Sequence, residues 1–225
     1  MRAGERGDTD VAHEDRRPPA AVLFNALGAD YEKAFAHAPA HLSALEWLIE
    51  RLPPGARTLD VGCGTGRPTA ATLVAAGHEV LGVDVSPVMV ALASRQVPGA
   101  EFRQADIREL PLEPGSFDGV CVFFSLLQMT RAEQSALLRR LAGALAPGGH
   151  LVLATVPADV EDLELAFMGH PVRATSFGPD AFAAVAEAAG LTVLSRHDAL
   201  FTPDHPDGGP EPHLFLYCRR DTARD

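Results

Sequence analysis

Three glycines follow a short apolar run in the stretch LDVGCGTGRP, residues 59–68, and glycines let a backbone approach a bound molecule closely. They stand at alternate positions, Gly62, Gly64 and Gly66. A dinucleotide-binding loop is spaced Gly-x-Gly-x-x-Gly, which would need glycine at position 67, where this chain has arginine. The loop therefore predicts a close backbone approach to a ligand, without the third glycine of a dinucleotide site.

Three aspartates accompany this loop. Asp60 lies two residues before the first glycine, and Asp84 and Asp106 end or follow the next two apolar runs. The carboxyl ends of parallel strands meet at one edge of a sheet, where a carboxylate can accept both hydroxyls of a ribose. Because three carboxylates would repel a pyrophosphate, the pattern predicts a pocket for a nucleoside that carries a positive charge.

These residues need a framework of alternating strands and helices, and the sequence from residue 57 has that pattern. Short apolar runs predict strands, each followed by a glycine or proline turn and a segment of helical periodicity. Such alternation predicts a mostly parallel sheet with helices on both faces. The expected strands are 57–61, 78–84, 100–106, 117–124 and 150–156, and the expected helices are 66–77, 86–96 and 131–149, the last ending in a Pro-Gly-Gly turn.

The two ends of the chain differ from this repeat. Residues 1–19 are charged, lack the apolar segment of a secretory signal and are expected to form a disordered leader. Residues 20–52 are expected to form two helices that break near Pro39. After an insertion at 157–177 and a helix at 178–190, strands 191–200 and 212–220 are expected to pair antiparallel around the proline-rich loop 201–211.

Composition excludes several classes of partner. The 225 residues include 19 Lys and Arg against 30 Asp and Glu, a net charge of −11 that disfavours nucleic acid. Apolar runs stop well short of the roughly 20 residues that a membrane helix needs. The cysteines Cys63, Cys121 and Cys218 form no disulfide framework, which favours a reducing cytoplasm.

Five stretches, taken in order, resemble the class I S-adenosylmethionine-dependent methyltransferases over roughly residues 20 to 220. The resemblance implies one α/β domain with a Rossmann-like, seven-stranded, mostly parallel sheet in the order 3-2-1-4-5-7-6, the last strand antiparallel. It further implies an N-terminal helical lid, 20–52, and acceptor-side insertions at 157–177 and 201–212. The stretches are LDVGCGTGR, VLGVDVSPVMV, FRQADIRELP, FDGVCVFFSLLQM and LAPGGHLVLAT.

The resemblance also implies roles around S-adenosylmethionine, with S-adenosylhomocysteine as the product. The loop glycines pass under the methionine part and the ribose, and Asp60 lies near the methionyl amine. Asp84 takes the ribose hydroxyls, while Asp106 binds the adenine amino group with Ile107 against the ring. The other residues implied at the cofactor are Tyr31 over its carboxylate, Val85, Met89 against the adenine, and Phe124 and Ser125 beside the methionine portion.

Simpler interpretations stay open for these residues. The glycines could form a plain strand–helix turn, Asp84 could cap a helix and Asp106 could lie in an exposed turn. Met89 could fill the core and Tyr31 could pack as an aromatic. Two departures from the family pattern matter. Where many members have a histidine after the fourth strand, this chain has Gln128. Metal-dependent members use acidic ligands and an asparagine, and because the chain's single asparagine, Asn25, lies in the N-terminal segment, no metal is expected.

The chemistry implied is an in-line displacement at the sulfonium methyl by an O or N nucleophile, for which a histidine is the favoured base. Our hypothesis is that His170 and Arg173, in the insertion 157–177, contact the acceptor while Tyr31 and Phe167 close the site. The alternative that stays open is a histidine on a surface loop and a solvated arginine. The weaker candidates are His205 and His213, the latter next to Glu211, while His37 and His41 are expected on an exposed helix face.

The leading functional hypothesis is a small-molecule O- or N-methyltransferase of specialised metabolism, present in the cytoplasm as a monomer or homodimer. Two alternatives remain open. One is an enzyme that kept the cofactor pocket for a non-transfer reaction such as cyclisation. The other is a non-catalytic binding module. Demethylated cofactor formed only in the presence of an acceptor would distinguish methyl transfer from both.

Overall fold

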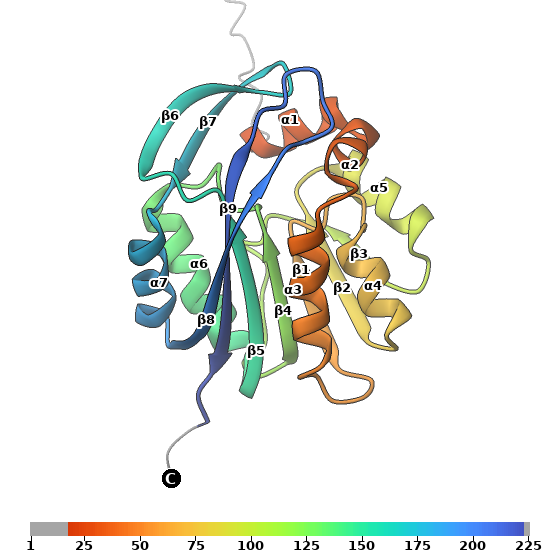
Figure 1. Ribbon diagram of the computed structural model, residues 1–225. Helices are drawn as coiled ribbons and strands as arrows, with labels where there is room; N and C mark the ends of the chain where they lie inside the picture. Colours follow the sequence, from red (N-terminus) through yellow and green to blue (C-terminus); the bar gives the residue numbers. More distant parts are fainter. Residues whose placement is uncertain (1–17, 223–225) are drawn as a thin grey trace, which may run out of the picture.

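A seven-stranded sheet runs through the centre of the protein, which a computed structural model describes over residues 18–222 (Figure 1). Short apolar runs form the inner strands. In β1, for example, Arg57 is exposed and the other four residues are buried. The strands of the sheet are β1 (Arg57–Val61), β2 (Glu79–Asp84), β3 (Glu101–Gln104), β4 (Phe117–Phe123), β5 (Leu145–Thr155), β8 (Leu191–Phe201) and β9 (Glu211–Arg220).

The strand order is β3-β2-β1-β4-β5-β9-β8. Counted among the sheet strands alone, this is the expected order 3-2-1-4-5-7-6. The pairs from β3 to β5 are parallel, whereas β9 runs antiparallel to both β5 and β8. The Rossmann-like fold class and the antiparallel last strand are therefore confirmed.

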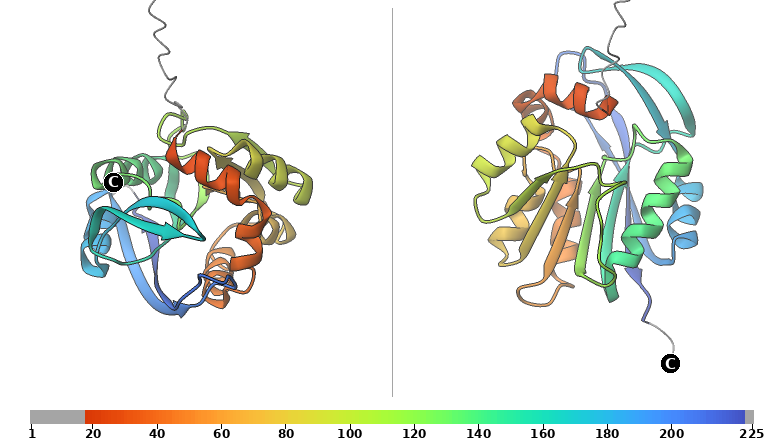
Figure 2. Two further views of the ribbon diagram at one scale, coloured as in Figure 1. Left: turned by 90° about the horizontal axis from the view of Figure 1, so that it is seen from above. Right: turned by 180° about the vertical axis from the view of Figure 1, so that it is seen from behind.

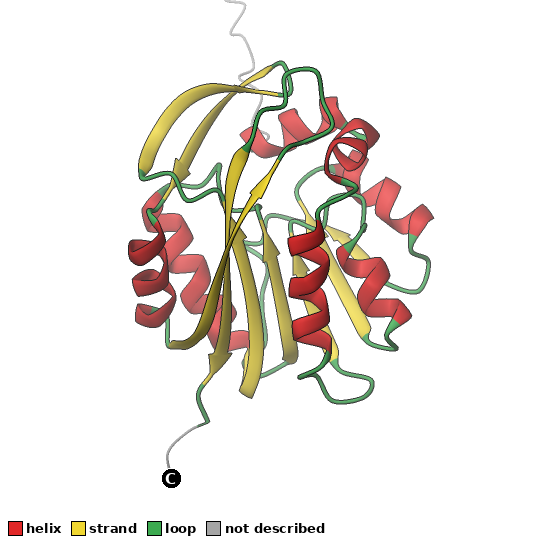
Figure 3. Cartoon of the chain, viewed as in Figure 1, coloured by secondary structure: helices red, strands yellow, loops and turns green. Residues whose placement is uncertain are grey.

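Helices cover both faces of this sheet (Figure 3). Leucines of α3 (Pro39–Ile49) and α4 (Thr69–Ala75) pack with β2, β4 and β5 on one face. On the other face, α6 (Arg131–Ala144) and α7 (Pro179–Ala188) bury apolar side chains against β4, β5 and β9. The helix α5 (Pro87–Gln96) packs beside β2 and β3.

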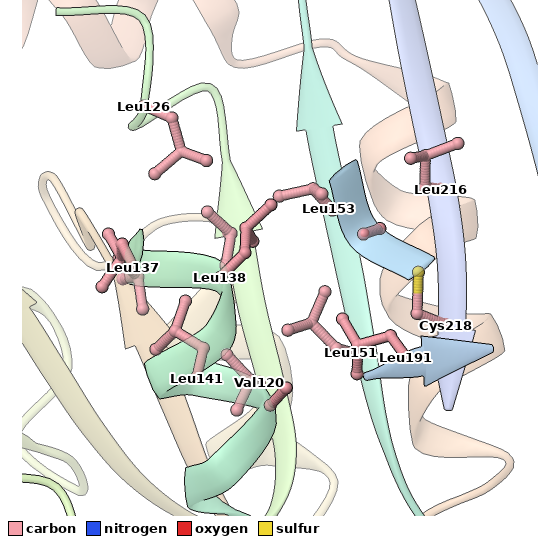
Figure 4. Packing of buried hydrophobic residues seen from close by; sticks show 14 of the residues in the cluster. Val120, Leu126, Leu137, Leu138, Leu141, Leu151, Leu153, Leu191, Leu216 and Cys218 are labelled. Carbon is pink, nitrogen blue, oxygen red and sulfur yellow. The ribbon is translucent and has the colours of Figure 1, made fainter. Parts of the chain in front are cut away.

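Figure 4 shows the core between α6 and the sheet, where the leucines of the helix meet those of the strands. Leu138 and Leu141 of α6 and Leu151 of β5 have no exposed surface. A capping box begins α6, in which the Thr130 hydroxyl accepts from the Glu133 N–H and the Glu133 carboxylate accepts from the Thr130 N–H. The buried leucines and the capping box together fix α6 against the sheet. The loop between β4 and α6, which leads into the site, is thereby held at both of its ends.

The N-terminal segment forms three helices, not the two expected. The break near Pro39 is present, because α3 begins there, but α1 (Pro19–Leu27) and α2 (Ala29–Phe35) are separated by Gly28. Gly28 adopts φ +49° and ψ −129°, a conformation that side-chain-bearing residues disfavour and that ends a helix. The first two helices cross the end of the sheet where the parallel strands finish (Figures 1 and 2).

The insertion 157–177 contains a second, two-stranded sheet that the sequence analysis did not anticipate. Its strands β6 (Val160–Phe167) and β7 (His170–Ser176) pair antiparallel and lie over the same end of the main sheet as α1 (Figure 2). A second correction concerns the expected Pro-Gly-Gly turn. The helix α6 stops at Ala144, and Leu145 is extended and pairs with Phe117, so the Pro-Gly-Gly residues belong to β5.

The predicted leader, 1–19, lies outside the described residues except for Pro18 and Pro19, and Pro19 is already the first residue of α1. The division of 20–220 into lid and insertions stays a prediction. Among residues 18–222, none of the helices combines the length and the apolarity needed to cross a membrane.

Candidate active site

The glycine loop turns sharply between β1 and α4. All three glycines have positive φ, +69° at Gly62, +52° at Gly64 and +79° at Gly66. A Cβ atom on Gly62 would lie 2.3 Å from the Cβ of Ser125, whereas one on Gly64 would meet no atom within 4 Å. Glycine at position 62 therefore allows the loop after β1 to approach the loop that carries Ser125. Gly64 faces open space that a ligand can occupy.

Asp84 is held at the end of β2 by two backbone amides. Its Oδ2 accepts from the Gly64 N–H at 2.9 Å and its Oδ1 accepts from the Ser86 N–H at 2.8 Å. Burial raises the pKa of this carboxyl group, and the amides of Ser86, Gly64 and Val85 oppose that shift. Each oxygen retains a lone pair, so this fixed carboxylate can accept two further hydrogen bonds, as from the two hydroxyls of a ribose.

Asp60, at the end of β1, is 2% exposed and its Oδ2 has no hydrogen-bond partner within the described residues. Burial, and secondarily the nearby Asp84, raises the pKa of Asp60 to about 8. A buried carboxylate without a partner is costly, and a cation placed beside it would relieve that cost. The arrangement fits the ammonium group of a methionyl moiety.

Asp106 follows β3 and is bound by its own neighbour. The Arg108 guanidinium donates to both carboxylate oxygens, with Nη2 2.6 Å from Oδ2, and it also pairs with Glu133 of α6. This contact holds the pKa of Asp106 below its ordinary value. Asp106 is therefore ionised and fixed next to Ile107, which is 5% exposed.

Three adjoining cavities surround these groups, and Tyr31 and Phe124 line all of them. The Asp84 cavity is bordered by Asp84, Val85, Asp106, Ile107, Ser125 and Met129. The His41 cavity is bordered by His41, Asp60, Gly62, Thr65, Arg67 and His213. The hairpin cavity lies under β6 and β7 and is bordered by Phe35, Leu163, Leu165, Phe167, Val172 and Glu211.

The structure brings most of the expected cofactor residues to these cavities. The exceptions are Met89, which has no exposed surface and lines none of them, and Gly66, whose Cβ position is crowded by Phe102, Val97 and Ala93. Met129 borders the Asp84 cavity, where Met89 was expected. The residues brought together are Tyr31, Asp60, Gly62, Gly64, Asp84, Val85, Asp106, Ile107, Phe124 and Ser125.

The two residues expected at the acceptor are not brought together around a cavity. His170 is the first residue of β7, at the hairpin turn, and lines none of the cavities described. Arg173 borders the hairpin cavity, but its guanidinium is bound to the Asp162 carboxylate and lies 3.6 Å from Glu164. Phe167, by contrast, lies against Tyr31, with ring centroids 6.4 Å apart.

Two histidines that the sequence analysis gave little weight lie at the site instead. His41 Nε2 is 2.9 Å from Thr69 Oγ1, and burial lowers the pKa of this imidazole to about 3. His213 is 3% exposed, and its Nε2 lies 2.7 Å from Glu211 Oε1. A usable signal existed for His41, because it precedes the buried Leu45 and Leu48 at helical spacing, whereas the expected inward residue Leu42 is 42% exposed.

The cavities fit the cofactor that the sequence resemblance implies. Buried atoms without a hydrogen-bond partner in the described part of the chain include Asp60 Oδ2, Ser125 Oγ and Gln128 Oε1, and each of these residues borders one of the cavities. The loop at Gly64 leaves open space beside Asp84. Among residues 18–222 no group of three or more His, Cys, Asp or Glu side chains could hold a metal ion, and metal independence stays a prediction.

Comparison with known proteins agrees with this geometry. A family model described as a methyltransferase domain matches residues 58–149. Trans-aconitate 2-methyltransferase of Methylobacterium nodulans is 35% identical over 159 residues, which are 69% of this chain and 60% of that relative. The chain thus spans about three-fifths of the length of this curated relative.

Two solved structures share the fold at lower identity. A Burkholderia thailandensis 1,6-didemethyltoxoflavin-N1-methyltransferase, solved with 1,6-didemethyltoxoflavin and S-adenosylhomocysteine, has a TM-score of 0.67 and 23% identity over 89% of this chain and 87% of its own. The [4+2]-cyclase SpnF has a TM-score of 0.69 and 19% identity over 92% and 97%. These two likenesses concern the fold. The family model and the 35% identical relative, with the glycine loop, the strand-end aspartates and the sheet order, establish that the chain belongs to the class I S-adenosylmethionine-dependent methyltransferases.

Proposed function

We propose that this protein transfers a methyl group from S-adenosylmethionine to an oxygen or nitrogen nucleophile of a small molecule. The observation that carries the proposal is the junction of the three cavities at Tyr31 and Phe124. Two cavities are bordered by carboxylates suited to a cationic nucleoside, and the third is bordered mainly by apolar side chains. One molecule in the first two would therefore meet a second molecule in the third.

Each residue of the cofactor site has a proposed part. Asp84 accepts the ribose hydroxyls, since its other lone pairs are fixed by Gly64 and Ser86. Asp60 faces the ammonium group, and Asp106 accepts the adenine amino group while Ile107 covers the ring. The remaining proposed contacts are Val85 beside the ribose, Gln128 and Met129 at the adenine, and Tyr31, Phe124 and Ser125 around the methionine portion.

When bound, the cofactor supplies a methyl group already activated on a sulfonium sulfur, and S-adenosylhomocysteine is what remains after transfer. The protein's contribution is position, because holding two reactants in line makes a bimolecular step effectively unimolecular. Tyr31 and Phe124 exclude water from the junction. The rings of Tyr31, Phe35 and Phe124 also present negative faces to a cation, an attraction worth about 0.5–2 kcal/mol for each favourable contact.

Three further features belong to the proposal. The acidic balance of the chain, 30 Asp and Glu against 19 Lys and Arg, favours a small molecule over nucleic acid. Cys63, Cys121 and Cys218 are buried and unpaired, as expected for the reducing cytoplasm. A monomer or a homodimer remains our expectation for the assembly.

Calorimetric binding of S-adenosylhomocysteine tests the cofactor site. Asp84→Asn removes a charge-assisted acceptor worth about 1.5–3 kcal/mol, so the affinity should fall by roughly ten to a hundred and fifty times. Glu79→Gln is the matched control, because Glu79 begins the same strand at the opposite edge of the sheet and is exposed. Unchanged binding by Asp84→Asn, with both variants folded, would contradict the proposal.

Methyl transfer itself is tested by S-adenosylhomocysteine release from S-adenosylmethionine with a panel of small-molecule acceptors. Release that depends on one acceptor supports transfer. The alternative is a non-transfer reaction such as cyclisation. A [4+2]-cyclase has the same fold, so the fold is compatible with this alternative. Conversion of a substrate with the cofactor unchanged would support that alternative, and cofactor binding without any turnover would support a non-catalytic module.

A further inference from the structure

The strands β6 and β7 present an apolar face to the hairpin cavity. Their register pairs Leu163 with Ala174 and Leu165 with Val172, and directly paired residues of an antiparallel sheet point to the same side. These four residues border the cavity together with Phe167. The cavity volume, about 210 Å³, is far more than the roughly 10–15 Å³ that one water needs. An apolar molecule of several atoms therefore has room under the hairpin.

The charged residues of the hairpin alternate with these apolar residues along the two strands. Glu164 and Arg173 are paired in the register between the apolar pairs, and both are exposed. Arg173 donates from Nη2 to Asp162 Oδ2 at 2.6 Å and to the Asp162 carbonyl at 2.9 Å. Arg173 also borders the cavity, but its positive charge is neutralised by the Asp162 carboxylate and offers little to an anion inside it.

Another part of the cavity wall is polar and includes the carboxylate of Glu211. Glu211 borders it, and its Oε1 is held by His213 Nε2, which is buried between the rings of Phe124 and Phe201. Among residues 18–222, the side-chain hydrogen bond of Glu211 is made by Oε1, which leaves Oε2 available to a ligand. Ser125 Oγ and Gln128 Oε1 are buried, also lack partners there and border the same cavity.

We propose that the methyl acceptor is an uncharged, largely apolar molecule with one hydrogen-bonding edge. Its apolar body packs against the inner face of the hairpin, and its O–H or N–H group donates to Glu211 Oε2, which His213 orients. A carboxylate-bearing acceptor is disfavoured, because Glu211 would repel it and Arg173 is already paired. This inference rests on the proposed function, since it names the class of molecule that the same site would methylate.

A matched pair of probes tests the proposal by binding alone. Calorimetry with 2-naphthol and 2-naphthoic acid, at neutral pH and with S-adenosylhomocysteine saturating, compares one ring system with a hydroxyl or a carboxylate. We expect 2-naphthol to bind at least about ten times more tightly, and Glu211→Gln to narrow that ratio by about ten times. The affinity of 2-naphthol reports on the apolar wall of the cavity. The change in the affinity ratio caused by Glu211→Gln reports on the carboxylate.

Two variants of the hairpin provide the second arm. Leu165→Asp puts a charge on the inner face and should weaken 2-naphthol binding by about ten times or more. Ala166→Asp places the same charge one residue along, on the outer face, and should leave binding unchanged. Folding of both is checked by thermal unfolding.

Each outcome bears on the proposal. Equal or tighter binding of 2-naphthoate, no binding of either probe, or unchanged binding by Leu165→Asp would overturn it. If S-adenosylhomocysteine binds while 2-naphthol does not, the acceptor class is wrong and the proposed function stands. If S-adenosylhomocysteine itself does not bind, the proposed function fails first.

Discussion

Gly62 and Ser125 lie so close together that a Cβ atom on Gly62 would come within 2.3 Å of the Cβ of Ser125. The contact joins the loop after β1 to the loop after β4, and both loops border the Asp84 cavity. An atom bonded to the backbone of Ser125 cannot move aside without moving its loop. The separation of the two loops at the cofactor site therefore depends on Gly62, where there is room for a hydrogen atom and not for a Cβ atom.

Gly62→Ala should consequently destabilise the protein more than Gly64→Ala does. Both substitutions place alanine at positive φ, at a cost of about 1–2 kcal/mol. Only Gly62→Ala adds a clash, for which overpacking data suggest about 1–3 kcal/mol more. Denaturant unfolding measures the difference. Gly64→Ala, whose added methyl enters the open ligand space, should still lose most of its S-adenosylhomocysteine affinity. Equal stabilities of the two variants would show that the loops are free to separate.

The stability of the protein should fall as pH rises through neutrality, because of Asp60. Its pKa is raised from 3.8 to about 8 by burial, so between these values the folded protein holds a proton that the unfolded chain has released. Unfolding then releases this proton, and stability declines by about 1.4 kcal/mol per pH unit for this group until it levels off above the folded pKa.

Asp60→Asn should remove that dependence while keeping the shape of the side chain. The variant is expected to gain stability relative to the original protein as the pH rises from about 5 to about 8, by a few kcal/mol at most. Urea unfolding at the two pH values measures it. The same variant should bind S-adenosylhomocysteine less tightly, because the ammonium group loses its carboxylate. A constant stability difference across this pH range would mean that Asp60 is ionised in the folded protein.

The cofactor half of the site was predictable because its residues are tied to strand ends. Asp60 is the last residue but one of β1 and Asp84 is the last residue of β2, and a parallel sheet brings such positions together whatever the helices do. The exception is informative. Met89 lies in the first turn of α5 and is buried in the core with no exposed surface. The direction of a side chain on a helix depends on the rotation of the helix about its axis, which the order of residues in the sequence does not determine.

The acceptor half was less predictable because it depends on how separate segments lie across one another. Within residues 160–167, apolar and charged side chains alternate only over 162–165, which is too short to predict the whole strand. The hairpin gains a role in the site only because it lies over the end of the main sheet. The strand pairing also places Arg173 opposite Glu164 and near Asp162, whose carboxylate binds its guanidinium. His41 and His213 come from α3 and β9, which are about 170 residues apart in the chain, and no local spacing relates them.

Contacts of Phe167 should decide how firmly the hairpin covers the site. A two-stranded sheet is marginal by itself, and the Phe167 ring packs against Tyr31 at 6.4 Å and Phe35 at 6.1 Å. Truncating a packed phenylalanine to alanine lowers the free energy of unfolding by about 3–5 kcal/mol at most. Phe167→Ala should therefore speed hydrogen exchange of the β6 and β7 amides. It should also weaken 2-naphthol binding by about ten times or more, because the ring is part of the cavity wall. Binding of S-adenosylhomocysteine should change little, since the carboxylates that hold it lie on the sheet.

Arg173→Gln is the comparison that separates packing from charge on this hairpin. The guanidinium is 57% exposed and paired with Asp162, and such surface pairs contribute about 0–1 kcal/mol. Exchange rates and both ligand affinities should stay close to those of the original protein. If Arg173→Gln instead abolished acceptor turnover while Phe167→Ala preserved it, Arg173 would be the acceptor contact that the sequence suggested, and its guanidinium would have to leave Asp162 to bind the acceptor.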